Sequence, residues 1–173
     1  MDIPQSILEK VRSLLSARFS KESRILQISP VAGGCIHHAH VLETSTGRFF
    51  LKWNGAAETG NFAAELKGLR LLAAHSRGFT AVPLGCGNDE KYSLLLLEFI
   101  RQGPPSPGFW PDFGRKLSEL HRHTSQFFGL EEDNYIGRLH QSNRRHAGFV
   151  SFFTEERLEP QVRLARSGQL IDA

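Results

Sequence analysis

The sequence predicts an α+β fold, in which a five-stranded antiparallel sheet with one main helix is followed by the first helices of a second lobe. Strand-like segments occur in the order strand, strand, strand, helix, strand, strand, which is expected for one antiparallel sheet with a helix laid against it. A segment rich in proline and glycine then interrupts the chain at 101–108. Beyond this segment, apolar residues recur mainly at helical spacing, so we expect the sheet to end before it.

The first part of the chain carries the predicted sheet. Apolar residues at helical spacing over 4–18 predict a helix, with Pro4 near its start. Short apolar segments bounded by turn-forming residues predict the five strands, at 24–31, 40–44, 48–53, 82–86 and 92–100. An alanine- and leucine-rich run at 61–75 predicts the helix between the third and fourth strands.

The clearest boundary is the segment at 101–108, where three prolines and two glycines disfavour regular structure. We therefore expect an N-terminal lobe at 1–102, and a linker with the start of a helical lobe at 103–173. Apolar spacing in the second part predicts helices at 111–124 and 149–164, with an irregular polar segment between them. Pro160 is expected to kink or divide the later helix.

Composition narrows the class of protein. Lysine and arginine total 21 against 18 aspartate and glutamate residues, and this mild, unclustered excess does not favour nucleic acid as a partner. The chain has neither a signal-peptide pattern nor an apolar run long enough to span a bilayer, so we expect no membrane partner. Its two cysteines, Cys35 and Cys86, fit a reducing compartment, which makes the cytoplasm the expected location.

Three residues are the first candidates for chemistry. Gly33 and Gly34 lie between two predicted strands, where glycine backbone amides can approach a phosphate, although tight hairpins use glycine for other reasons too. Lys52 lies within an apolar strand, on the same face as Phe50. It either has a buried partner or reaches solvent at the edge, since an unpaired buried charge is costly.

Glu65 is the expected partner of Lys52. On its predicted helix it shares one stripe with Phe62, Leu69 and Leu72, so a carboxylate interrupts an apolar face and invites a cation from the sheet. A glycine loop, a strand lysine and a glutamate on the following helix are the arrangement by which protein kinases hold the phosphates of ATP. The alternative is a structural ion pair without a ligand.

The fourth candidate is the end of the last strand. Glu98, Phe99 and Ile100 run directly into the proline-rich break, which is the position of the hinge in a two-lobed kinase. Backbone groups of a hinge bond the adenine edge, so side-chain identity says little there. Any strand that enters a linker has the same pattern.

Six segments resemble the fructosamine (ketosamine) kinase family in their order along the chain. They are GGCIHHAHVLETSTGRFFLKWN, FAAELKGL, LEFI, LSELHRHT, FGLEEDNYIGRLHQSN and FFTEERLEPQVRLA. The resemblance extends from about Ile25 onward and implies a protein-kinase-like fold similar to that of aminoglycoside and choline kinases. It also implies ATP-dependent phosphorylation of the 3-hydroxyl of ketosamines, the adducts of sugars with lysine amines, which leads to deglycation of proteins.

The resemblance implies a role for several residues. Its ATP-binding positions comprise the nucleotide loop, the phosphate lysine with its partner, and the hinge: Gly33, Gly34, Lys52, Glu65, Glu98, Phe99, Ile100 and Arg101. A second family segment, expected on the substrate side, contains Asp133, Asn134 and Gln141, for which a structural role in a loop is an equal alternative.

The resemblance also implies parts that the chain lacks. The family's HGD segment, with its catalytic base, and the metal-ligating residues that follow it have no counterpart here, because no HGD or HxD pattern occurs in these 173 residues. We therefore expect no catalytic residue and no metal ligand within this chain, and expect the base and the ligands for Mg²⁺ beyond residue 173. The expected cofactors are ATP and Mg²⁺, and the chain alone is expected to be inactive.

Two other functions stay open at this point. One is a related small-molecule kinase that acts on aminoglycosides, choline or homoserine. The other is a non-catalytic ATP-binding or interaction module, which the missing catalytic segment favours for the chain as given. An incomplete helical lobe would also expose apolar side chains such as Phe149, Phe152 and Leu158, so a homodimer or other association through these helices is expected.

Two further groups have weaker chemical signals. Cys35 lies in the glycine loop, where an accessible thiol could form a regulatory disulfide, or could simply fill a small space. His38 and His40 share a strand face next to His37, but they lack a nearby carboxylate, so we expect polar strand residues rather than a metal site.

Overall fold

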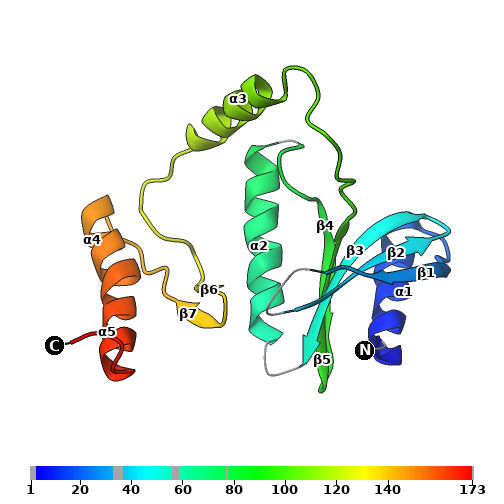
Figure 1. Cartoon of the computed structure of the whole chain (residues 1–173), viewed down its shortest axis with the longest axis horizontal. Helices are drawn as coiled ribbons and strands as arrows, with labels where there is room; N and C mark the ends of the chain where they lie inside the picture. The colour runs from blue at the N-terminus through cyan, green and yellow to red at the C-terminus, as the bar shows by residue number, and fades with distance from the viewer. Residues whose placement is uncertain (1–2, 33–36, 56–58, 77, 173) are drawn as a thin grey trace. The chain divides into compact units, whose positions relative to one another are not determined.

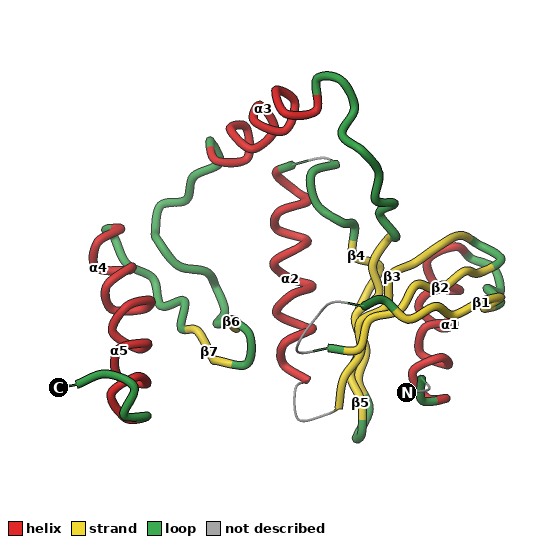
Figure 2. The backbone as a smooth tube through the Cα atoms, in the orientation of Figure 1, coloured by secondary structure: helices red, strands yellow, loops and turns green. Residues whose placement is uncertain are grey.

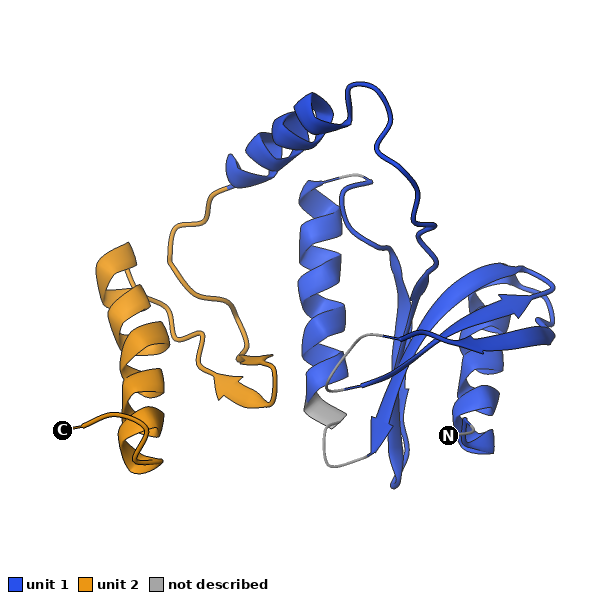
Figure 3. Ribbon diagram, in the orientation of Figure 1, with its two compact units in different colours: residues 1–123 blue, residues 124–173 orange. Residues whose placement is uncertain are grey.

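The computed structural model describes residues 3–32, 37–55, 59–76 and 78–172. The chain divides into two compact units, residues 1–123 and residues 124–173 (Figure 3). Within the described residues, none of the helices combines the length and the apolar composition that crossing a bilayer requires.

The first unit contains the predicted five-stranded antiparallel sheet (Figure 1). Its strands lie in the order β1-β2-β3-β5-β4, and all neighbouring pairs are antiparallel. The bounds are β1 (Ile25–Pro30), β2 (His38–Thr44), β3 (Gly47–Gly55), β4 (Pro83–Asn88) and β5 (Tyr92–Glu98). The sheet confirms the predicted α+β class, and each strand lies within two residues of its predicted bounds.

A helix covers each face of this sheet, where the sequence predicted one main helix. On one face, α1 (Gln5–Phe19) packs Ile7, Val11 and Leu15 against apolar residues of β2, β3 and β5 (Figure 1). On the other face, α2 (Thr59–His75) packs Phe62 and Leu66 against β5. Two apolar faces need two covering layers, which is why the N-terminal helix joins the core.

The leucines of β5 hold both covering helices, α1 and α2, against the sheet. All four leucines are buried, and they alternate between the two clusters: Leu94 and Leu96 pack with α1, whereas Leu95 and Leu97 pack with α2. A continuous apolar run is the pattern of a strand covered on both faces. Full burial of one such side chain stabilises the fold by roughly 2 kcal/mol.

The first unit also contains α3 (Phe109–His121), which follows the proline-rich segment (Figure 2). Residues 101–108, all of them described, contain neither helix nor strand, as predicted. Phe113 of α3 has its ring 5.3 Å from that of Phe79, and His123 lies 4.4 Å from His75 at the end of α2. These contacts join α3 and the residues after it to the end of α2 and the loop that follows α2, while the expected lobe boundary at residue 102 stays a prediction.

The second unit contains a short hairpin and a divided helical run. The hairpin of β6 (Asn134–Ile136) and β7 (Leu139–Gln141) lies in a segment that was predicted to be irregular, so that prediction was wrong here. Gly137 has φ of 63°, a left-handed conformation that glycine adopts at no steric cost and that closes the turn. The pairing is only three residues long on each strand, too short to leave a periodic signal.

The helical run comprises α4 (Phe149–Phe153), the π-helical turn η2 (Thr154–Leu158) and α5 (Glu159–Ser167). It is divided next to Pro160, as predicted, because proline has no N–H to donate in a helix interior and lies in the first turn of α5. The amide of Glu159 donates to the carbonyl of Thr154, which closes the π turn. Phe149 and Leu158 are about half exposed, so the expected apolar surface is present in this unit.

Gly129 provides a test of the second unit's packing. Its φ is +115°, and a Cβ atom there would lie 2.5 Å from the carbonyl oxygen of Asn143 and 2.8 Å from that of Arg144. The Gly129→Ala variant is expected to lower the free energy of unfolding by about 2 kcal/mol or more, measured by urea denaturation. The control is Gly114→Ala in α3, where a Cβ meets nothing within 4 Å. An equal effect of both substitutions would contradict the close approach.

His40 provides a test of the first unit that depends on pH. This buried imidazole accepts a hydrogen bond at Nδ1 from Trp53 Nε1, 3.3 Å away, and burial, together with the nearby His38, lowers the pKa of His40 below its usual 6.5. Because protonation is disfavoured in the folded state, His40 contributes stability above about pH 6.5, and this is lost as the pH falls through the folded-state pKa.

The variant His40→Gln isolates this contribution, because glutamine does not titrate. The difference in the free energy of unfolding between the wild type and this variant is expected to be larger at pH 8 than at pH 5, measured by urea titrations followed through Trp53 fluorescence. A difference that does not change with pH would show that His40 stays neutral or makes no net contribution.

Candidate functional site

The site in the first unit is centred on the ion pair that the sequence predicted. Lys52 Nζ lies 2.8 Å from Glu65 Oε1 and 2.7 Å from Oε2, so both carboxylate oxygens accept from one ammonium. Charge-assisted bonds of this length are stronger than those between neutral groups. The two side chains are 22% and 33% exposed, so the pair is shielded but still reachable from solvent. The predicted pairing is confirmed.

The local structure explains why these two side chains meet. Lys52 lies in β3, the middle strand of the sheet, on the face that α2 covers. Glu65 follows Phe62 by one helical turn, so it lies beside the buried part of α2. The Lys52 ammonium is also 5.9 Å from the centroid of the Phe62 ring, close enough for a cation–π contribution. The ammonium is therefore held by a carboxylate and an aromatic face together.

The glycine loop borders this site in the sequence, but Gly33, Gly34 and Cys35 lie outside the described residues. The two strands on either side of the loop are described. The amide of Val31 donates to the carbonyl of Ala39 at 2.9 Å, which extends the pairing of β1 with β2 up to the loop. The roles predicted for the two glycines and the cysteine stay predictions.

The expected hinge lies where β5 ends. The Glu98 carboxylate accepts from the amide of Val82 at 3.0 Å, and the Glu98 amide donates to the carbonyl of Val82 at 2.9 Å, so this side chain holds β5 to the start of β4. Phe99 is half-buried, whereas Ile100 and Arg101 are exposed and belong to no helix or strand. This placement fits a linker, and the contact of its backbone with adenine stays a prediction.

The predicted substrate-side residues lie in the second unit, in and beside its hairpin. Asp133 accepts from the amide of Asn143 at 2.7 Å and lies 3.1 Å from His140 Nε2. Gln141 Nε2 donates to Asn134 Oδ1 at 3.0 Å across the hairpin. The structure thus brings Asp133, Asn134 and Gln141 together, and their hydrogen bonds connect the hairpin to itself and to Asn143 just after it. These contacts support the structural alternative, while a role toward substrate stays a prediction.

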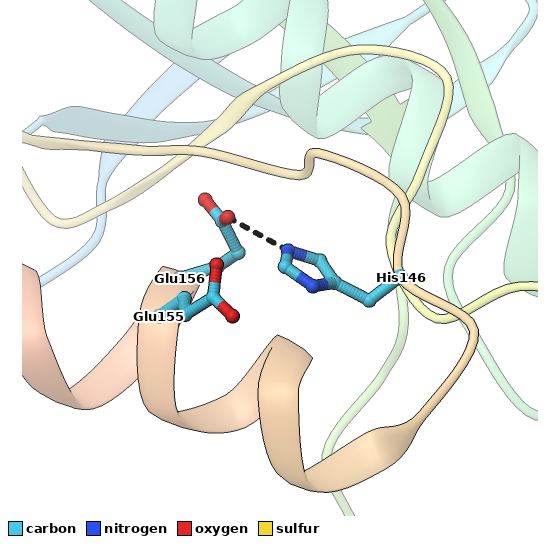
Figure 4. Close-up of side chains that lie close together, drawn as sticks. All are labelled: His146, Glu155 and Glu156. Atoms are coloured by element: carbon cyan, nitrogen blue, oxygen red, sulfur yellow. Dashed lines mark hydrogen bonds and ion pairs between the residues drawn. The ribbon is translucent and has the colours of Figure 1, made fainter.

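A charged cluster in the second unit was missed by sequence reasoning (Figure 4). Glu156, only 6% exposed, has its Oε1 2.8 Å from His146 Nε2 and 2.9 Å from Arg144 Nε. Arg144 also reaches Glu155, with 2.6 Å between Nη2 and Oε2. A hydrogen bond from Ser142, followed by those from His146 and Arg144, lowers the pKa of Glu156 to about 2. The carboxylate is therefore ionised at neutral pH.

The cluster has metal-ligand chemistry, but both of its carboxylates are already paired with a guanidinium. His146, Glu155 and Glu156 offer ligand atoms within 4.8 Å of one another. However, the Arg144 guanidinium bonds both carboxylates, so a cation would have to displace it. The arrangement acts as an anchor that holds the segment before α4 onto η2. Arg144 and Arg145 were visible in the sequence only as a short basic pair, and no spacing rule joins them to residues on a π turn.

Comparisons with known proteins agree with this fold. The sequence model of the fructosamine kinase family matches residues 7–173. The protein-ribulosamine 3-kinase of Arabidopsis thaliana chloroplasts is 36% identical over 149 residues, which are 84% of this chain and 45% of that protein. A protein assigned as a ketoamine kinase in Enterococcus faecium is 34% identical over 139 residues, 80% of this chain and 48% of that one.

The fold is shared with solved structures. A crystal structure assigned as a fructosamine-3-kinase of Haemophilus somnus superimposes with a TM-score of 0.85 at 24% identity, covering 94% of this chain and 56% of that one. A second, from Thermobifida fusca, has a TM-score of 0.78 over the same shares. The chain spans about half the length of the relatives it matches. Since the family model matches residues 7–173, nearly the whole length of the chain, the chain belongs to the fructosamine kinase family.

Proposed function

We propose that this chain supplies the ATP-binding part of a kinase that phosphorylates ketosamines. The observation that carries the proposal is the bidentate Lys52–Glu65 pair on the α2 face of the antiparallel sheet. In kinases this pair holds an ammonium where it neutralises the charge on the phosphates of ATP. The family membership and the names of the relatives support the same reaction class.

The chemistry assigned to Lys52 follows from its surroundings. Glu65 orients the ammonium, and the Phe62 ring restricts its movement, so the charge is positioned before the nucleotide binds. A pre-oriented cation stabilises the charge that develops on the transferring phosphoryl group without having to reorganise. Mg²⁺ would supply further neutralisation of the phosphates when bound.

The proposed reaction transfers the γ-phosphoryl group of ATP to the 3-hydroxyl of a ketosamine. A bond forms between the sugar oxygen and phosphorus, the bond to the ADP oxygen breaks, and the hydroxyl proton passes to a base. The ketosamine class is supported by the ribulosamine and ketoamine kinases among the relatives.

The cytoplasmic location and association through the apolar helices of the second unit remain part of the proposal.

A second candidate is a non-catalytic ATP-binding or interaction module. The observation that favours it is the absence of an HGD or HxD pattern in the 173 residues. Such a module would bind ATP through Lys52 and Glu65 but would transfer no phosphoryl group. The two candidates therefore differ in turnover and agree in nucleotide binding.

The variant Lys52→Ala tests the proposed role of the lysine. In the full-length gene product, we expect it to lower the rate of ketosamine phosphorylation by about 100-fold or more, because the cation on the phosphates is lost. The assay is release of ADP with a synthetic fructosamine as acceptor, and thermal unfolding checks that the variant is folded. The matched control, Lys116→Ala on the exposed side of α3, should retain full activity. Normal turnover by Lys52→Ala would refute the assignment.

A panel of acceptors tests the substrate class. Full-length protein is supplied with ATP and with fructosamine, ribulosamine, an aminoglycoside, choline or homoserine. We expect phosphorylation of the two ketosamines, with a kcat/KM at least about 100-fold above that for the other acceptors. Preference for another acceptor would assign a related kinase. ATP binding without transfer to any acceptor would support the non-catalytic module.

A further inference from the structure

A second group of contacts in the first unit joins the beginning of β2 to the first turns of α2. The His37 ring lies 4.7 Å from the Phe62 ring, centroid to centroid, at an interplanar angle of 45°. Asn54, near the end of β3, has its Nδ2 3.1 Å from His37 Nδ1. His37 therefore contacts Phe62 of α2 and Asn54 of β3, both of which lie well after His37 in the sequence.

These contacts are continuous with the Lys52–Glu65 pair. The Phe62 ring is 1% exposed and lies 5.9 Å from the Lys52 ammonium, so one ring meets both the histidine and the lysine. Lys52 and Asn54 are two residues apart in β3 and lie on the same face of the sheet. His37, Phe62, Asn54, Lys52 and Glu65 thus form one chain of contacts on the α2 side.

The geometry of α2 makes the position of Glu65 depend on the position of Phe62. The two residues are three apart and lie on neighbouring turns, so a movement of the first turns of α2 would carry both side chains with it. The Lys52–Glu65 bonds are 2.7 and 2.8 Å long, and a shift of the helix by 1 Å would lengthen them beyond ordinary hydrogen bonds. Whatever holds Phe62 in place therefore also maintains the ion pair.

We propose that His37 is a positioning residue of the nucleotide site, which holds the start of α2 against the sheet through Phe62 and so keeps Glu65 on Lys52. The proposal rests on the function proposed above. With its proton on Nε2, His37 accepts from Asn54 at Nδ1, and this bond fixes the plane of the ring that packs on Phe62. His37 thereby acts on the phosphates through Glu65 and Lys52.

The neighbouring His38 is a matched control. Its side chain lies on the opposite face of β2, and its ring packs on Trp53 at 4.5 Å, on the α1 side of the sheet. Replacing His38 by alanine removes an aromatic contact of similar kind from the same strand. It leaves the contacts of Phe62, Lys52 and Glu65 in place.

The experiment is a double-mutant cycle on the affinity for ATP, measured by calorimetry on the full-length protein. His37→Ala is expected to weaken ATP binding about fivefold or more in the wild-type background, and less than about twofold in a Glu65→Gln background. A residue that acts only on overall stability would have the same effect in both backgrounds, and that result would overturn the proposal. His38→Ala should leave the affinity unchanged, and an equal loss in this control would also overturn it.

A second variant, His37→Phe, tests the proposal even if His37→Ala fails to fold. His37→Phe keeps a ring on Phe62 but cannot accept from Asn54, so we expect an affinity for ATP between those of His37→Ala and the wild type. A loss of affinity in His37→Phe as large as that in His37→Ala would contradict a role for the ring contact. The outcomes also separate the two proposals. If Lys52→Ala loses ATP binding while His37→Ala does not, only the role of His37 fails. If Lys52→Ala binds ATP normally, the nucleotide site itself fails.

Discussion

The ion pair between Lys52 and Glu65 is the interaction on which the rest of the account depends. Each charged group is mostly removed from water, and burying either charge without the other would cost folding free energy. The pair therefore fixes the distance between the middle of β3 and the second turn of α2. It also places a positive charge beside an otherwise apolar cluster.

The sheet can hold this ion pair because its two faces are covered by apolar clusters of different size. The α1 face is closed by a large apolar cluster that contains Leu51 and Trp53, and it provides much of the stability of the unit. The α2 face has a smaller apolar cluster, so a charged pair can occupy part of it. Alternation along β3 assigns Leu51 and Trp53 to the α1 face and Lys52 to the α2 face, where we propose that the phosphates bind.

Much of this arrangement could be predicted from the sequence, because it depends on short-range patterns. Strand alternation predicted the sheet face on which Lys52 lies, and helical spacing predicted that Glu65 lies on the apolar face of its helix. The order of the strands and the helix predicted that the two side chains meet. The role of α1 as a second covering layer was not predicted, because helical spacing shows an apolar face but not what it packs on. The anchor of Glu156 with Arg144 and His146 was also missed, since it depends on the path of an irregular segment and on a π turn. The β6–β7 hairpin was too short to recognise.

The most direct test of the central claim compares ATP with adenosine as ligands. Both share the base and the ribose, so the difference in their affinities isolates the phosphates. Calorimetric titration of the full-length protein should give tighter binding of ATP than of adenosine, and Lys52→Ala should remove most of that difference while leaving adenosine binding unchanged. An unchanged preference for ATP in the variant would contradict the claim that Lys52, held by Glu65, binds the phosphates.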